Sequence, residues 1–292
     1  PVYHKEVETF EVYDENNNYL GLLYTDFYPR PTKQGGAWMT SFKDQWITRD
    51  GTNSRPHISL VMNFTRPTAS APALLTYDEV ETFLHEFGHA LHGLMTNVQY
   101  ESLSGTNVYR DFVELPSQLM ENWLPRQEFL ATFAHHYLTG EVLPDSLTQK
   151  IRDTQRYHVA YQCVRQLTYG LLDMAWHTTD ARVDDITAFE RNATASTQLL
   201  PAIDGTLFSA QFSHIFGGGY AAGYYGYKWA EVLDADAFSL FQEKGIFDRE
   251  TAASFRKNIL EKGDTEDPMS LYVRFRGREP QIDALMQRDG IK

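Results

Sequence analysis

The sequence predicts a mainly α-helical fold with a small β-sheet near the N-terminus. Residues 1–70 hold short segments rich in β-branched and aromatic residues, which favour strands. After Thr76, apolar residues recur at helical spacing almost to the end of the chain, with breaks at prolines and at glycines 217–219. We therefore expect a sheet region, residues 1–70, and a helical region, residues 71–292, which together form one unit.

Turn residues separate the predicted strands. Residues 14–18 supply turn chemistry between the first two strands. Gly35-Gly36 marks a loop before Ala37-Trp38-Met39. The predicted strands are residues 8–13, 19–27 and 58–64.

The helix predicted after Thr76 contains the most informative pattern of the chain. Thr76-Tyr77-Asp78-Glu79 is a capping-box sequence, which places the start of the helix. Because residues four apart share a helix face, His85 and His89 can offer two imidazole nitrogens to one metal ion. Glu86 lies beside them, placed to act on a water bound to that metal. The alternative is a buried amphipathic helix whose histidines only fill space.

Two residues near this pattern have predicted structural roles. Gly88 inside a helix costs about 1 kcal/mol relative to alanine, and close packing against a second backbone would account for it. His92 does not have the spacing of a third histidine ligand in the metzincin pattern. We interpret His92 as a packing or hydrogen-bonding residue.

Glu114 is the candidate third ligand, 25 residues after His89. Two histidines and a carboxylate leave one tetrahedral position open for water, as in a catalytic zinc site. We predict one zinc per chain at His85, His89 and Glu114. Pro116 is expected in the first turn of the next helix or at a kink. A polar stripe is predicted at Asp111, Glu114, Gln118 and Glu121.

A histidine ligand commonly donates its outer ring N–H to a nearby acceptor. Glu81 precedes His85 by four residues and Asp78 precedes it by seven. Either carboxylate could accept that hydrogen bond, and plain solvent exposure is the alternative for both.

Residues 214–227 combine glycines, tyrosines and His214 in an order that no regular element favours. Glycines permit close approach to a ligand, and tyrosine hydroxyls can donate hydrogen bonds to an oxyanion. The alternative is an aromatic packing loop.

Composition excludes several classes of protein. The net charge of −13, without a basic cluster, argues against a nucleic-acid partner. Cys163 is the only cysteine, so neither an internal disulfide nor a cysteine zinc site is possible. No apolar run approaches about 18 residues, so no membrane span is expected.

Several motifs together resemble the thimet-oligopeptidase family of zinc metallopeptidases. The segments that carry this resemblance are residues 85–92, Ser104-Gly105-Thr106, residues 111–114, Pro116-Ser117-Gln118 and residues 214–227. Within the family, Gly35-Gly36-Ala37-Trp38-Met39 and the six-residue step from His214 to Tyr220 are closer to the bacterial peptidyl-dipeptidases (dipeptidyl carboxypeptidases).

The resemblance implies a role for each matching residue. The implied zinc ligands are His85, His89 and Glu114, and the implied general base is Glu86. The implied substrate and transition-state residues are Tyr220 and Tyr227, with His214 opening their segment. The family also implies a zincin-like catalytic region in which a strand near the zinc, residues 58–64 or the segment at Ala37-Trp38, pairs with substrate.

The resemblance further implies short, unstructured peptide substrates and release of C-terminal dipeptides. Arg110, Tyr224 and Tyr225 are candidates to bind the free carboxylate of such a substrate. The alternatives are an endo-acting oligopeptidase of the same family and a catalytically impaired fragment that binds metal or peptide.

Members of the family form two lobes around a channel and are more than twice as long as this chain. We therefore expect a C-terminal catalytic portion, weakly active or inactive alone and inclined to self-associate through an exposed inner face. The chain opens at Pro1 with no initiating methionine and no signal-peptide pattern. Its localisation is left open between cytoplasm and periplasm.

Overall fold

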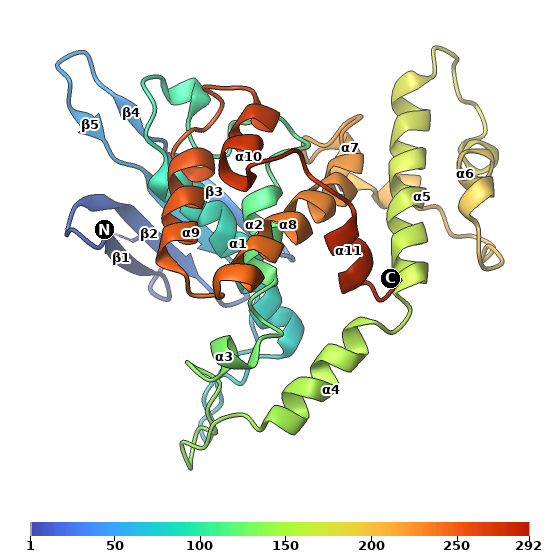
Figure 1. Ribbon diagram of the computed structural model, residues 1–292. Helices are drawn as coiled ribbons and strands as arrows, with labels where there is room; N and C mark the ends of the chain where they lie inside the picture. Colours follow the sequence, from blue (N-terminus) through green and yellow to red (C-terminus); the bar gives the residue numbers. More distant parts are fainter. Residues whose placement is uncertain (1, 292) are drawn as a thin grey trace.

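The computed structural model describes residues 2–291 and has a small sheet followed by many helices (Figure 1). Pro1 and Lys292, the outer ends of the two expected regions, lie outside the described residues. The predicted fold class, mainly helical with a small N-terminal sheet, is confirmed. The strands are β1 (Glu8–Tyr13), β2 (Tyr19–Asp26), β3 (Trp38–Lys43), β4 (Trp46–Ile47), β5 (Asn53–Ser54) and β6 (His57–Val61).

The helices occupy the rest of the chain and vary widely in length. They are α1 (Tyr77–Met95), α2 (Leu115–Glu121), α3 (Gln127–Leu130), α4 (Asp145–Gln155), α5 (Val159–Thr178), α6 (Ile186–Thr194), α7 (Ser213–Phe216), α8 (Tyr225–Lys244), α9 (Arg249–Phe255), α10 (Pro268–Arg276) and α11 (Asp283–Arg288). Short 3₁₀ turns lie at Glu101–Leu103, Ala195–Thr197 and Ser209–Gln211, and a π-helical turn follows α9 at Arg256–Leu260.

The main sheet has the strand order β1-β2-β6-β3. β2 and β6 are parallel, whereas β1 and β3 pair antiparallel with their neighbours. β6 is shorter than the strand predicted for residues 58–64, although the N–H groups of Met62 and Phe64 continue the hydrogen bonding to Asp26 and Phe27. β3 forms one edge of the sheet, with no further strand beside it among residues 2–291.

Helix α1 covers one face of this sheet. Its start is fixed by the predicted capping box, in which Thr76 and Glu79 bond each other's backbone N–H groups. Ala90 and Leu94 of α1 are buried against Ile58 and Leu60 of β6. The sheet therefore shares its core with the helix that carries the two histidines.

A second core joins α2 to the C-terminal helices, and it centres on Leu115, Leu119, Phe238 and Tyr272. α5 and α6 lie side by side at the edge of the molecule, away from the sheet (Figure 1). Within residues 2–291, no helix has both the length and the apolar character needed to cross a bilayer.

Candidate active site

The three predicted metal ligands lie together. His85 and His89 on α1 and Glu114 at the N-cap of α2 each offer a ligand atom, and these atoms lie within 4.8 Å of one another. The Nε2 atoms of His85 and His89 are 3.2 and 3.1 Å from Oε2 of Glu114. With tetrahedral zinc bonds of about 2.0–2.1 Å, two ligand atoms lie about 3.3 Å apart. The donor set therefore fits such an ion.

Gly88 allows the two helices that carry the ligands to touch. A Cβ at this position would lie 2.6 Å from the Cα of Ser117 and would also clash with the carbonyl oxygen of Pro116. The predicted close packing against a second backbone is confirmed. Pro116 takes a first-turn position of α2, where its missing N–H removes no helical hydrogen bond.

The site favours a cation. Burial opposes ionisation of Glu114, but hydrogen bonds from His85 and His89 outweigh it and lower the pKa of that carboxyl well below its usual value. Burial would lower the pKa of His85, yet hydrogen bonds with Glu114 and Glu121 raise it well above its usual value. Ser117 donates its hydroxyl to Oε2 of Glu114 over 2.8 Å and fixes the orientation of the carboxylate.

The acceptor for the outer nitrogen of His85 is Glu121, not Glu81 or Asp78 as considered from the sequence. Its Oε1 lies 2.6 Å from His85 Nδ1. Glu121 follows Glu114 by seven residues, and this two-turn spacing could have revealed it. Asp111 lies before α2, so the predicted polar stripe does not extend to it. Its carboxylate instead accepts a hydrogen bond from the Tyr225 hydroxyl over 2.6 Å.

We expect Glu121→Gln to weaken metal binding by about 10- to 100-fold, because outer hydrogen-bond partners orient a ligand and raise its basicity. Competition with a chromophoric chelator measures the affinity. Glu81→Gln is the matched control, since Glu81 lies on α1 one turn before His85 without a hydrogen bond to that ring. Equal losses in both variants would contradict the assignment of Glu121.

Glu86 lies between the metal group and the sheet. Its side chain is buried, and burial raises the pKa of its carboxyl, while the backbone of Met39 on β3 hydrogen-bonds the carboxylate and opposes that rise. A carboxylate with a raised pKa is a better proton acceptor. Of the two segments considered for the strand near the metal, the one at Ala37-Trp38 leads into β3, which contacts Glu86.

Tyr220 and Tyr227 lie beside the metal group, close to Glu114. Their rings stack with centroids 5.0 Å apart, and Tyr220 donates its hydroxyl to Oε1 of Glu114. Burial, together with the nearby Glu114 charge, raises the pKa of both phenols, so both keep the proton that a donor needs.

The segment predicted as irregular from residue 214 to 227 is shorter in the structure. His214 lies on α7, and α8 begins at Tyr225, so Tyr227 is in the first turn of a helix. The exposed His214 ring lies 6.1 Å from the ring of Tyr220 and 6.3 Å from that of Tyr227. The structure thus brings His214 to the two tyrosines.

The three candidates for binding a substrate carboxylate differ in availability. Tyr224 is buried in an aromatic cluster with Phe212. Tyr225 is committed to Asp111. The exposed Arg110 lies with its guanidinium 5.2 Å from the centre of the Tyr220 ring and forms no ion pair among residues 2–291.

His92 is fully buried, and neither of its ring nitrogens has a hydrogen-bond partner among the described residues. Burial lowers its pKa to about 3, so the ring is neutral. It lies outside the group of possible metal ligands. His92 is therefore a packing residue.

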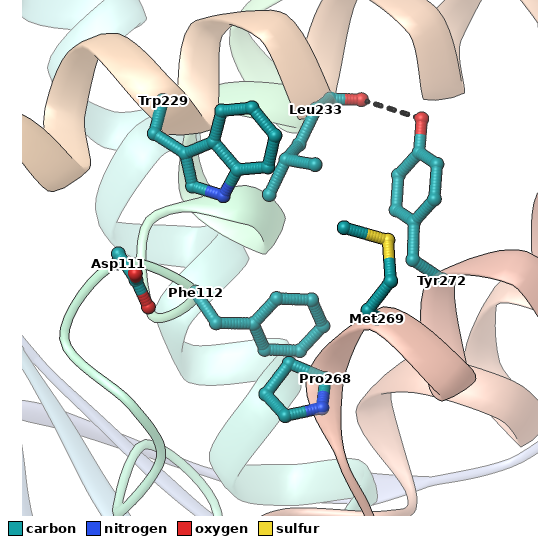
Figure 2. A pocket seen from close by; sticks show the side chains of 7 residues that line it. All are labelled: Asp111, Phe112, Trp229, Leu233, Pro268, Met269 and Tyr272. Atoms are coloured by element: carbon teal, nitrogen blue, oxygen red, sulfur yellow. Dashed lines mark hydrogen bonds between the residues drawn. The ribbon is translucent and has the colours of Figure 1, made fainter. Parts of the chain in front are cut away.

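The half-open cavity in Figure 2 is a different place from the metal group. It measures about 40 Å³ and lies between Phe112, Trp229, Leu233 and Met269. The hydroxyl of Tyr272 beside it donates to the carbonyl oxygen of Leu233. The cavity has room for about one water and its walls are mostly apolar. It therefore has no catalytic character.

Comparison with known proteins places this geometry in a family. Residues 1–291 match peptidase family M3. The chain belongs to peptidase family M3. Among family M3 relatives, oligopeptidase A of Escherichia coli (strain K12) is 47% identical over 297 residues, and the match covers 100% of this chain and 43% of that protein. The chain therefore spans less than half the length of this relative.

A second relative is named a dipeptidyl carboxypeptidase, the type of enzyme that the sequence motifs favour. Dipeptidyl carboxypeptidase of Escherichia coli (strain K12) is 42% identical over 294 residues, again with 100% of this chain and 43% of that protein covered. The family predicted from the motifs is thus confirmed. The narrower prediction of a peptidyl-dipeptidase stays a prediction, because both names occur among relatives.

The fold also recurs in a solved structure. The M32 carboxypeptidase from Deinococcus radiodurans R1 superimposes with a TM-score of 0.60 at 18% identity, over 93% of this chain and 55% of that chain. At this identity the likeness concerns the fold alone.

Proposed function

We propose that this chain is the catalytic part of a zinc metallopeptidase that cleaves short peptides. The observation that supports the proposal best is the meeting of His85, His89 and Glu114 with Glu86 beside them. Two imidazoles and one carboxylate leave a position open for water, as catalytic zinc sites do.

In the proposed reaction Glu86 moves the proton. Zinc, when bound, lowers the pKa of its water to about 7 and polarises the peptide carbonyl. Glu86 accepts the proton of the attacking water and then passes it to the leaving amine. Its buried position beside Met39 keeps the carboxyl away from bulk water.

We also propose that β3 aligns the substrate. β3 is an edge strand, so its outer N–H and C=O groups can pair with an extended peptide. The contact between Met39 and Glu86 means that such a peptide would run past the general base. An unstructured substrate fits this arrangement because it can adopt the strand conformation.

Tyr227→Phe should lower kcat by about 10²–10³-fold with little change in KM, because the Tyr227 hydroxyl would donate to the oxyanion mainly in the transition state. Steady-state kinetics on a fluorogenic peptide give both constants. Tyr225→Phe is the matched control, since that hydroxyl is committed to Asp111. A change confined to KM would assign Tyr227 to ground-state binding instead.

For the mode of cleavage we propose release of C-terminal dipeptides, with Arg110 as the group that binds the substrate carboxylate. Arg110 lies against Tyr220, and no described acidic residue neutralises it. A free guanidinium is suited to a carboxylate, which it can bind through two parallel hydrogen bonds. Internal cleavage is the second candidate, favoured by the name of the oligopeptidase A relative.

A pair of peptides that differ only at the C-terminus tests this mode. The free acid should lose a dipeptide, and its amide should be cleaved at least about tenfold more slowly, as expected when one charged contact is lost. Arg110→Ala should abolish this preference, whereas Arg165→Ala, which removes a similar contact with Tyr169, should keep it. Mass spectrometry identifies the products. Equal internal cleavage of both peptides would reject the release of C-terminal dipeptides. The weak or absent activity of this chain alone and its self-association also stay predictions.

A further inference from the structure

We infer that Asp173 on α5 is a positioning residue, which holds the backbone of residues 222–224 and thereby places Tyr220 and Tyr227. The inference rests on the proposed function of these two tyrosines. Asp173 is remote from them in sequence and was not singled out by any motif. The only indication of this role in the sequence is that Asp173 is a charged residue within the otherwise apolar run Leu171-Leu172-Asp173-Met174.

The carboxylate of Asp173 is fully buried and serves backbone donors. Its Oδ1 accepts the N–H of Ala222 and its Oδ2 accepts the N–H of Tyr224, each over 2.9 Å. The Nδ1 atom of His177 lies 2.8 Å from Oδ1. A buried carboxylate is tolerated only with such partners, so these contacts fix both the side chain and the loop.

The loop needs an external anchor. Ala222 has a φ of +52°, a left-handed conformation that is unfavourable for a residue other than glycine. α8 starts just after it and has no side-chain cap from its N-cap residue, Tyr224. Asp173 supplies the missing acceptor and places a negative charge at the positive end of a 20-residue helix.

The anchored residues lie between the two proposed catalytic tyrosines. Tyr220 precedes Ala222 by two residues, and Tyr227 follows Tyr224 in the first turn of α8. The stacked rings and the bond from Tyr220 to Glu114 require both sides of the loop to hold their places. A displacement of about 1 Å can cost about 100-fold in rate. Asp173 thus acts on the reaction through the tyrosines.

The test uses the intact, zinc-loaded protein with Asp173→Ala and Asp173→Asn. We expect Asp173→Ala to lower kcat by about 10- to 100-fold, with metal content unchanged and KM within about threefold. Asp173→Asn keeps one acceptor oxygen, so its kcat should fall less. This variant also tests the inference if the alanine variant does not fold. Hydrogen exchange at the amides of Ala222 and Tyr224 should be faster in both variants than in the unaltered protein.

The matched control is Glu190→Ala. Glu190 on α6 likewise accepts two backbone N–H groups, those of Phe208 and Ser209, but it does not touch residues 220–227. Its loss should lower the melting temperature and leave kcat within about twofold.

A coupling experiment separates positioning from general destabilisation. In a Tyr220→Phe/Tyr227→Phe background, Asp173→Asn should change kcat by no more than about twofold, because the groups that it positions are gone. A loss as large as in the unaltered protein would overturn the inference, as would unchanged hydrogen exchange at Ala222 and Tyr224. Absence of peptidase turnover in the unaltered protein, even when the upstream part expected from the family is supplied, would instead reject the proposed function. The exchange data would still decide whether Asp173 holds the loop.

Discussion

Glu86→Gln should retain one zinc per chain and lose peptide hydrolysis by at least about 10²–10⁴-fold, the usual contribution of general acid–base catalysis. The amide has nearly the same shape as the carboxylate and can still hydrogen-bond near Met39. It cannot accept the proton of the attacking water. The proposed ligands His85, His89 and Glu114 are unaltered, so the loss should appear in kcat and not in metal content.

Two measurements define this result. Metal analysis of the purified variant checks the zinc, and single-turnover kinetics on a bound peptide check the chemical step. Glu81→Gln, on the same helix, is the control for the loss of one half-buried carboxyl and should cleave at a near-normal rate. Hydrolysis by Glu86→Gln within about tenfold of the unaltered rate would reject Glu86 as the base.

His89→Ala should abolish stoichiometric metal binding and with it all measurable hydrolysis. His89 is one of the three proposed zinc donors. The two that remain cannot form the three-ligand site of a catalytic zinc ion. The fold should persist, because the cores beside the sheet and around α8 do not depend on the ring of His89. Circular dichroism and metal analysis together test both statements.

His92→Leu is the companion to His89→Ala. The two histidines lie about one helical turn apart, but His92 is outside the metal group and packs without a hydrogen bond to any residue from 2 to 291. Leucine fills a similar volume, so this variant should keep its metal. Tight, stoichiometric zinc in His89→Ala, or loss of zinc in His92→Leu, would show that the ligands have been assigned wrongly.

Local signals predicted the elements of the site well. The capping box at Thr76 placed the start of α1, and the spacing of His85 and His89 placed their side chains on one face. Gly88 in the middle of a helix indicates a close contact with a second backbone, and the structure has this contact at Pro116 and Ser117. These inferences succeeded because each depends on residues within a few helical turns.

Inferences that depended on tertiary contacts were weaker. The sequence offers Glu81 or Asp78 on α1 as the partner of His85, whereas the docking of α2 brings Glu121 to that ring. Residues up to Tyr227 were expected to be irregular because of their glycines, yet Asp173 on α5 anchors the start of α8. No local pattern reports a hydrogen bond between segments about 50 residues apart, since neither segment needs it to form its own structure.

The contact at Gly88 has a consequence for metal selectivity. Because α1 and α2 meet backbone to backbone there, packing sets the separation of the imidazoles from Glu114 before any ion arrives. A prearranged donor set orders fewer side chains on binding, so less conformational entropy is lost. It also cannot expand easily to six ligands. The protein would then discriminate among divalent ions by coordination geometry, favouring tetrahedral ions over ions such as Mg²⁺ that demand an octahedron.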